Sequence, residues 1–392
     1  MSYELPKAGM IATPALAIYA EAVRENIATT LRLLAAPAGW DVTTAPPLVG
    51  AAGLRAAAAR WRPHVKTAKL AATVRELVAQ GITQCKCATT LELAVALEAG
   101  AADVLIAYPL RGPHMDRVRA LARAHPEARV SALAEVEDDV APWIGSGVGL
   151  FWDLNPGMDR TGAPLASGGA LPALARMREH GVEFRGLHYY DGHLGALPLA
   201  ERTSAARRGY DALVEFAAAL ARAGYPPPEV VTAGTPALPC SLGYDGFLDA
   251  PFVHRVSPGT VVYGDTTSLS QLPAAYGYRP AALVLARVVS QPAPNIVTCD
   301  AGHKAVSADC GVPNCEVWGR SDLTALRPSE EHLPFAVAAG APPPARGELL
   351  YLVPRHVCPT VNNFDHALWI ERGGALRIEP VSARGHEKPL AR

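Results

Sequence analysis

The chain has 392 residues, of which 49% are hydrophobic and 19% charged, and its formal net charge is −1. These values are typical of a globular protein with a large core, and a charge so near zero gives no support for nucleic acid or an anionic membrane as a partner. Seven scattered cysteines argue against a disulfide framework, and neither a secretion signal nor a membrane-spanning apolar run stands out, so we expect a cytoplasmic protein.

The first predicted elements are a short strand and a helix. ALAIYA at 15–20 has the composition of a strand, and EAVRENIATTLRLLA at 21–35 has the apolar spacing of a helix. The segment 36–53 is rich in Pro, Gly and Thr, which predicts a loop insertion.

Short apolar runs then alternate with helical stretches over about 200 residues. The predicted strands are 64–66, 84–88, 103–109, 129–134, 149–154, 184–190, 229–233 and 260–264. Most are separated by stretches with helical spacing, such as 72–81, 90–100 and 117–125. Strands that are apolar almost throughout are expected where helices cover both faces of a sheet. Eight such repeats favour a closed (β/α)8 barrel over an open doubly wound sheet, and no GxGxxG follows the first strand.

Beyond about residue 270 the pattern changes to strands and hairpins. The predicted strands there are 282–291, 295–302 and 347–354, followed by a hairpin at 366–381 that turns at Gly373-Gly374. We therefore predict an α/β protein with a barrel at 29–270 and a β-rich domain made of 1–28 and 271–392.

Chemically active residue types gather where the barrel strands are predicted to end, which is where functional residues collect in such barrels. Lys66 ends the first strand, Asp153–Arg160 follow the fifth, and His188–His193 follow the sixth. A lysine at a strand end can also be a solvated surface charge, so Lys66 alone does not define a site.

Two glycine–threonine turns follow the last strands. Gly234-Thr235 comes after strand seven, and Gly259-Thr260 lies at strand eight. Backbone N–H groups beside glycine can approach an anion closely, and threonine adds a donor, so this pair of turns predicts a phosphate site. A phosphate site opposite a strand-end lysine is what pyridoxal phosphate requires, because the lysine amine bonds to its aldehyde.

A histidine and a cysteine near the C-terminus could share a zinc ion. In an extended segment, His356 and Cys358 would lie on one side of the strand, about 7 Å apart along the backbone. Two protein ligands are fewer than the three usual at a catalytic zinc, so the pair alone does not establish a metal site. Cys85 and Cys87, also on one face of a strand, are expected to be an ordinary buried pair.

The segment RPHVKTAKL at 62–70 resembles the lysine motif of the D-threonine aldolase and eukaryotic-type D-serine dehydratase family, which belongs to the alanine racemase-like, fold-type III pyridoxal phosphate enzymes. The resemblance continues in order through NPGMDRTG (155–162), YDGH (190–193), CDAGHKAVSADCG (299–311), SEEH (329–332), HVCPTVN (356–362) and SARG (382–385). It implies a barrel with a C-terminal β domain, in agreement with the fold predicted above. Ala68 departs from the family motif, where histidine is usual.

The resemblance also implies roles for individual residues. Lys66 would bind pyridoxal 5'-phosphate covalently, and Arg160 would face the phenolic oxygen of that cofactor. The residues that would hold its phosphate are Gly234, Thr235, Gly259 and Thr260. Tyr190 and His193 would line the substrate side. His356 and Cys358 would bind a divalent metal, and the thiolate favours Zn²⁺.

The function implied is that of a lyase acting on a β-hydroxy-D-amino acid. Family members with His-x-Cys are typically dehydratases, so we predict a reaction of the D-serine or 3-hydroxyaspartate type that gives a 2-oxo acid and ammonia. The alternatives are aldol cleavage to glycine and an aldehyde, an amino-acid racemase, and a non-catalytic pyridoxal phosphate carrier. A homodimer is expected, because relatives with this fold pair head to tail.

Overall fold

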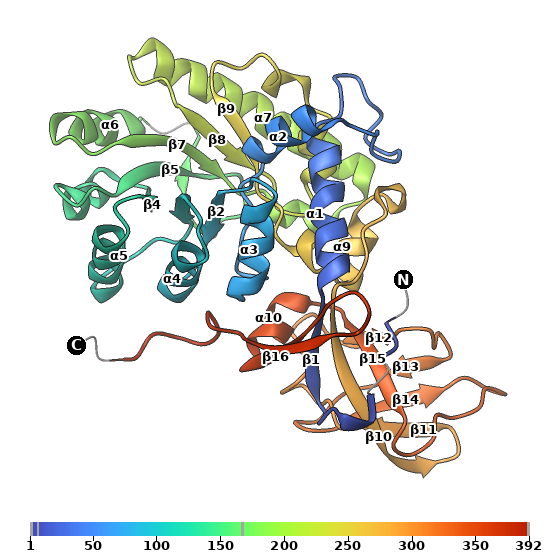
Figure 1. The fold of residues 1–392 in the computed structure, drawn as a ribbon. Coiled ribbons are helices and arrows are strands. Elements are labelled where there is room, and N and C mark those ends of the chain that lie inside the picture. Colours follow the sequence, from blue (N-terminus) through green and yellow to red (C-terminus); the bar gives the residue numbers. More distant parts are fainter. Residues whose placement is uncertain (1–2, 6–7, 166–167, 390–392) are drawn as a thin grey trace.

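In the computed structural model, the chain forms two sheets that are joined through helix α1 (Ala20–Leu34) (Figure 1). The structure describes residues 3–5, 8–165 and 168–389, so the outermost ends of the predicted β-rich domain lie outside the described residues. Within those ranges, no helix is long and apolar enough to cross a membrane. The predicted architecture, a (β/α)8-type barrel with a separate β-rich domain, is confirmed.

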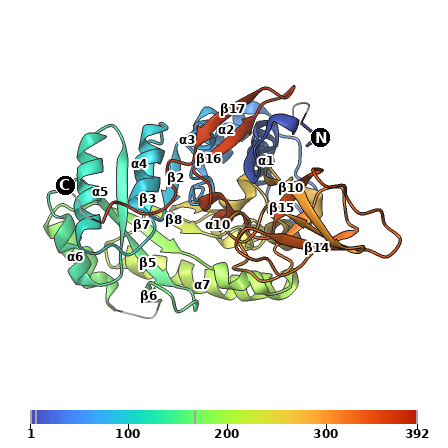
Figure 2. The ribbon, with the colours of Figure 1, turned by 90° about the horizontal axis from the view of Figure 1, so that it is seen from below.

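A curled parallel sheet forms the larger unit. Its strands follow the order β2 (Gln84–Cys87), β3 (Asp103–Ile106), β4 (Arg129–Ala134), β5 (Gly149–Asn155), β7 (Phe184–Tyr189), β8 (Glu229–Thr232) and β9 (Val253–Val256), with β6 (Ala163–Pro164) beside β5. The helices that lie around the outside of this sheet include α3 (Ala71–Ala79), α4 (Thr90–Glu98), α5 (Pro113–Ala124), α6 (Ala170–Glu179) and α7 (Leu199–Arg222) (Figure 2). Helices and strands thus alternate along the chain as predicted.

The segment that leads to Lys66 lies between the two edge strands of this sheet. Trp61 forms a parallel bridge with Val256 of β9, and His64 forms one with Lys86 of β2. Backbone hydrogen bonds from Arg62 N to Val256 O (2.9 Å) and from Val65 N to Lys86 O (2.8 Å) support the same pairing. The predicted first strand is therefore reduced to a short closing segment, but it still delivers Lys66 to the end of the barrel.

The prediction of a strand at 260–264 is wrong. The strand lies earlier, at β9, and Thr260–Val262 form a 3₁₀ turn, η6. Val261 and Val262 are buried in this turn, so the apolar run reflects burial and not an extended backbone. The loop predicted at 36–53 also ends earlier than expected, because helix α2 (Ala51–Ala59) begins inside it.

A mostly antiparallel sheet of nine strands forms the second unit. Its strands follow the order β13 (Leu323–Ala325), β14 (Leu333–Val337), β11 (Ile296–Cys299), β10 (Ala282–Ala293), β1 (Ala15–Tyr19), β16 (His366–Ile370) and β17 (Leu376–Pro380), with β12 (Cys315–Val317) and β15 (Leu349–Pro354) off this path. Strand β1 lies between β10 and β16, so the N-terminal strand joins the C-terminal sheet as predicted. The hairpin β16–β17 and its Gly373-Gly374 turn are also confirmed.

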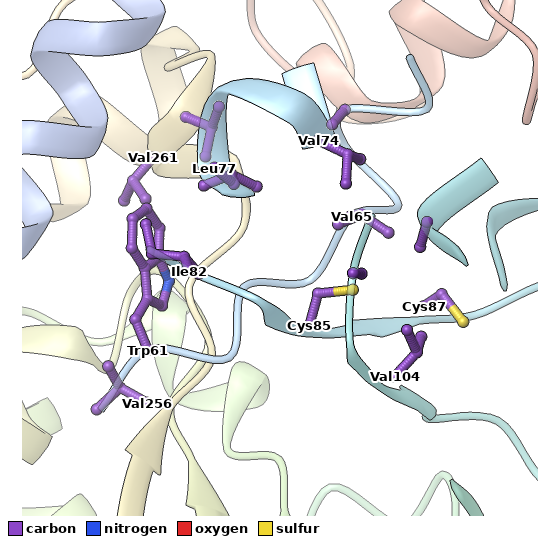
Figure 3. Close-up of a cluster of buried hydrophobic side chains, with 14 of the residues drawn as sticks. Trp61, Val65, Val74, Leu77, Ile82, Cys85, Cys87, Val104, Val256 and Val261 are labelled. Atoms are coloured by element: carbon purple, nitrogen blue, oxygen red, sulfur yellow. The ribbon is translucent and has the colours of Figure 1, made fainter. Parts of the chain in front are cut away.

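Strand β2 separates an apolar layer from the interior of the barrel. Cys85 and Cys87 are buried free thiols that lie among Trp61, Val65 and other apolar side chains (Figure 3). The prediction of an ordinary buried pair is confirmed. Because side chains alternate along a strand, the residue between the two thiols, Lys86, points to the opposite face, inside the barrel.

A buried arginine, Arg62, lies in an ionic cluster at the end of the barrel opposite Lys66. The Arg62 side chain is 0% exposed, and its guanidinium contacts Glu229 at 2.7 Å and Asp103 at 3.0 Å. Arg185 and Arg255 also pair with these two carboxylates. Asp103 and Glu229 begin strands β3 and β8, so this ionic cluster ties strand starts together and lies away from the strand ends where chemistry is expected.

Candidate active site

Lys66 lies at the end of the closing segment, two residues after His64, which contacts the second glycine–threonine turn. A side chain at Gly259 would place its Cβ 2.2 Å from the carbonyl oxygen of His64, so only glycine allows the two segments to approach this closely. The backbone N–H of Lys66 donates to Nδ1 of His64 at 3.2 Å. Burial, together with the charges of Lys66 and Lys86, holds the pKa of His64 well below its usual value, consistent with a neutral ring that accepts this hydrogen bond.

Three cationic side chains surround the ring of Tyr190. The Cζ atom of Arg160 lies 4.9 Å from the ring centroid, and the Nζ atoms of Lys86 and Lys66 lie at 5.2 and 6.0 Å. These residues come from four different segments of the barrel, so the fold brings them together as one positively charged centre. Such a centre attracts anionic ligands.

Two glycines make room for Tyr190. A Cβ at Gly192 would lie 2.3 Å from Oη of Tyr190, and one at Gly234 would lie 2.9 Å from its Cε2. The absence of a side chain at Gly234 therefore allows the ring of Tyr190 to pack against the backbone. Its N–H donates to Asp191 at 3.3 Å, and burial raises the pKa of that carboxyl.

The backbone N–H groups of Thr235 and Gly259 have no hydrogen-bond acceptor within the described residues. Thr260 follows directly, at the start of η6. Unpaired donors beside glycine, near a cluster of cations, fit an anion such as a phosphate. Of the two predicted turns, the one at Gly259 offers the more open donors, because Asp191 already occupies the N–H of Gly234.

Backbone strain is concentrated near the same residues. Within the described ranges, the only non-glycine residues with positive φ are Lys69 (52°), Asp159 (54°) and Ala233 (56°). Asp159 and Ala233 directly precede Arg160 and Gly234. Sparsely populated backbone conformations cluster at binding and catalytic sites, so this distribution supports a functional role for the region.

His193 also has an unsatisfied polar atom. It lies in the 3₁₀ turn η4 (Gly192–Ala196), and its Nδ1 is buried without a hydrogen-bond partner among the described residues. A buried ring nitrogen without a protein partner is available to a ligand. Both predicted substrate-side residues, Tyr190 and His193, thus follow the end of β7, three positions apart in the chain.

The predicted metal pair lies at the start of a helix, which corrects the expectation of an extended segment. His356 is the residue before α10 (Val357–Asn362), and Asp265 accepts a hydrogen bond from Val357 N at 2.9 Å. The proline in the first turn of this helix is compatible with helical geometry, because its missing N–H is not needed there.

This helix start carries the thiol of Cys358 to the barrel. Its Sγ lies 3.1 Å from Oγ1 of Thr67 and 3.9 Å from Oγ1 of Thr260. Thr67 follows Lys66 in the chain, and Thr260 follows Gly259. The β-rich domain therefore brings its predicted metal ligand against both the lysine segment and the open glycine turn.

His356 has a carboxylate partner that the sequence reasoning missed. Its Nδ1 lies 2.6 Å from Oδ2 of Asp309 and 3.6 Å from Sγ of Cys310. A carboxylate on one ring nitrogen orients the imidazole so that the other nitrogen is free to bind a metal with Cys358. The ligand atoms of Asp309, Cys310 and His356 also lie within 4.8 Å of one another, which allows a second arrangement for an ion.

Electrostatics favour a thiolate at Cys358 and an imidazolium at His356, so a metal ion that binds the pair must displace a proton from His356. Burial opposes both charges, but hydrogen bonds and charges from Cys358 and Asp309 raise the pKa of His356 to about 9. Burial likewise raises the pKa of Cys358, but His356 and Lys66 outweigh it and the net shift is downward. A thiolate is the form of cysteine that binds metals, so this donor set fits zinc.

Several other residues of the matched motifs do not join this centre. Lys69 forms an ion pair with Glu92 at 2.9 Å, and Arg384 pairs with Asp365. His303 is exposed. Lys86 is a further residue that the sequence reasoning missed, although the alternation of Cys85 and Cys87 was a signal that the intervening lysine faces the barrel interior.

Two protein-family models match the chain. Residues 51–267 match "Alanine racemase, N-terminal domain", and residues 281–370 match "Putative serine dehydratase domain". The chain belongs to the alanine racemase-like enzyme family. The resemblance seen in the motifs is thereby confirmed, and the barrel is the unit covered by the longer match.

Proteins that are similar to this chain include an aldolase and a dehydratase. The chain is 27% identical to D-threonine aldolase from Arthrobacter sp over 339 residues, which are 83% of this chain and 86% of the relative. Among solved structures, D-threonine aldolase from Filomicrobium marinum has a TM-score of 0.82 at 24% identity, covering 98% of both chains. D-threo-3-hydroxyaspartate dehydratase from Delftia sp. HT23 has a TM-score of 0.77 at 22% identity, covering 97% of this chain and 99% of that one.

Two further solved structures are variants of a D-threo-3-hydroxyaspartate dehydratase. One has a histidine replaced by alanine, and the other has a cysteine two positions later replaced by alanine and is in a metal-free form. At 21% identity, these structures establish the shared fold alone.

Proposed function

We propose that this protein is a pyridoxal phosphate-dependent, zinc-assisted lyase that removes water from a β-hydroxy-D-amino acid, giving a 2-oxo acid and ammonia. The observation that carries the proposal is the contact between Cys358 and Thr67, 3.1 Å from Sγ to Oγ1, which puts the candidate metal ligand beside Lys66. A β-hydroxy substrate held at Lys66 would present its hydroxyl toward a neighbouring metal.

The residues present fit the cofactor. Lys66 supplies a primary amine, and Arg160 a permanent positive charge beside it. The open N–H groups of Thr235 and Gly259 would hold a phosphate, with Gly234 and Thr260 completing that wall. Bound pyridoxal phosphate supplies an electron-accepting ring that stabilises negative charge on the substrate's Cα.

The protein's own groups would then move protons and orient the substrate. The Lys66 amine would take the proton from Cα, because it is the basic group that substrate binding frees at this place. Tyr190 and His193 would line the substrate side. His356 and Cys358 would hold zinc, which supplies a Lewis acid for the β-hydroxyl, a poor leaving group without such assistance.

Dehydration is preferred over the alternatives because of the His-x-Cys pair. The positions replaced by alanine in the two dehydratase variants are a histidine and, two residues later, a cysteine, and the cysteine variant is in a metal-free form. Aldol cleavage to glycine and an aldehyde is the second candidate, because the D-threonine aldolase relative is similar over most of the chain. Racemisation requires a second base on the opposite face of the substrate and gives the metal pair no role.

Product analysis tests the proposal. We expect purified protein with pyridoxal phosphate and zinc to convert D-serine or D-threo-3-hydroxyaspartate into a 2-oxo acid and ammonia, and a chelator to lower the rate at least about a hundredfold. Glycine with an aldehyde would identify an aldolase, and the L-enantiomer would identify a racemase. Full activity after complete removal of metal would contradict the zinc role.

A pair of cysteine variants locates the metal. Cys358→Ala should weaken zinc binding by at least about a hundredfold, because it removes one of only two protein ligands. Cys310→Ala is the matched control and should keep zinc, because Cys310 lies on the Nδ1 side of His356, where Asp309 already binds. Zinc content after dialysis measures both effects. Loss of zinc in Cys310→Ala alone would instead assign the ion to Asp309, Cys310 and His356.

A further inference from the structure

Lys86 is a buried lysine without a carboxylate partner of its own. It lies on β2 with 2% of its surface exposed, and none of the ion pairs in the described part of the chain involves it. A fully buried charge without a partner is costly, and lysine is rarely buried for structural reasons alone. The burial of Lys86 therefore indicates a functional role.

A line of hydrogen bonds runs from Lys86 across the interior of the barrel. Its Nζ lies 3.2 Å from Nε2 of His188, and Nδ1 of His188 lies 2.6 Å from Oδ1 of Asp153. Asp153 and His188 are also direct neighbours in the pairing of β5 with β7. The Asp153 carboxylate accepts a hydrogen bond from Nδ1–H of His188, which leaves Nε2 as an acceptor for Lys86. The other oxygen of Asp153 has no partner among the described residues.

The charges that face Lys86 come from every side of the site. The cationic or ionisable neighbours are Lys66, His64, His188 and Arg160, and the acidic ones are Asp153 and Asp191. Burial lowers the pKa of Lys86 most, Lys66 and Arg160 lower it further, and the two carboxylates oppose them, for a value of about 7. Near neutral pH, both the ammonium and the neutral amine are therefore populated.

We propose that Lys86 is a switchable charge in the wall of the cofactor site, which as an ammonium strengthens the binding of an anionic pyridoxal-type phosphate and as a neutral amine does not. This inference rests on the proposed function, because it needs that class of ligand to bind beside Tyr190. Lys86 is then a positioning residue that acts through its charge, distinct from Lys66, which bonds to the aldehyde. His188 and Asp153 fix where that charge lies.

Pyridoxine 5'-phosphate is a suitable probe, because it carries the ring and phosphate but lacks the aldehyde and cannot bond to Lys66. Its affinity for the full chain would be measured by calorimetry from about pH 6 to about pH 9, a range that spans the titration of Lys86. The ligand's own ionisation affects every variant equally, so the ratio between variants at each pH is the informative quantity.

Three variants separate charge from shape. At the acidic end, Lys86→Met should bind about tenfold more weakly than the natural protein, as expected for one unit charge in a partly buried site, and the two should converge at the alkaline end. Lys86→Arg should keep the tight binding across the whole range, because a guanidinium stays charged. Asp153→Asn should move the convergence to lower pH, since the Asp153 charge favours the ammonium.

The outcomes distinguish an error in the proposed cofactor site from an error in the role inferred for Lys86. If the natural protein does not bind the probe at any pH, the proposed cofactor site is wrong. If it binds and Lys86→Met follows the natural protein at every pH, Lys86 does not act through its charge. If Lys86→Arg follows the natural protein at every pH, the charge of Lys86 does not switch in this range. Either result overturns this inference, while the cofactor site stands. Thermal melts of each variant identify any that fail to fold. If a Lys86 variant fails to fold, the pH shift in Asp153→Asn tests the inference in its place.

Discussion

Replacement of Lys66 by alanine is expected to abolish turnover, by at least about a thousandfold, and to prevent covalent attachment of pyridoxal phosphate. The reason is that Lys66 is proposed both to bond to the cofactor and to take the proton from Cα, and that Thr67, its neighbour in the chain, contacts the thiol of Cys358. The checks are the visible absorption of the bound cofactor, borohydride trapping followed by peptide mapping, and kcat on the best substrate.

Lys69→Arg is the matched control for Lys66→Ala. Lys69 belongs to the same motif, but its Nζ pairs with Glu92 and the carbonyl oxygen of Ala383. An arginine retains a positive charge there while removing the primary amine, so the cofactor band should survive. A band that persists in Lys66→Ala and disappears in Lys69→Arg would reassign the covalent attachment.

The largest effect on stability is expected at the other end of the barrel. Arg62→Met should lower the free energy of unfolding by about 3–5 kcal/mol, because it leaves the buried carboxylate of Glu229 and the partly buried carboxylate of Asp103 with fewer compensating charges. Urea unfolding of the full chain without cofactor measures this loss. A loss below about 1 kcal/mol would show that Arg185 and Arg255 are sufficient partners by themselves.

The same substitution at a partly exposed arginine provides a comparison for this loss of stability. Arg24 also contacts two carboxylates, Glu76 and Glu371, but 36% of its side chain is exposed, so Arg24→Met should cost about 1 kcal/mol or less. The loss caused by Arg62→Met should also depend on pH. Burial opposes the charge of Asp103, but Arg62 lowers its pKa, so this stabilisation is present at neutral pH and is lost as pH falls through that lowered value.

Periodicity and strand-end position were enough to find the barrel and its lysine. Short apolar strands between helices specified the parallel sheet, and Lys66 was located by the rule that functional residues follow barrel strands. The misplaced strand at 260–264 shows the limit of this reasoning, because a buried apolar turn and a buried strand have the same composition over so few residues.

The partners of the site residues depend on contacts that sequence spacing does not encode. Asp309 and His356 are far apart in the chain and meet only because the β-rich domain folds them together. The same holds for the line from Lys86 through His188 to Asp153, which joins three strands across the barrel interior. The position of Cys358 beside Thr67 likewise follows from the helix start at His356, where the sequence predicts extended backbone.

The place of β1 in the second sheet has a consequence for biosynthesis. This strand is made first, yet its neighbours β10 and β16 follow only after the whole barrel has been synthesised. The nascent chain must therefore keep an apolar N-terminal segment unpaired while the barrel forms, and the small domain can close only near the end of translation. Because the candidate metal pair lies just before β16, the candidate site can be completed only late in the synthesis of the chain.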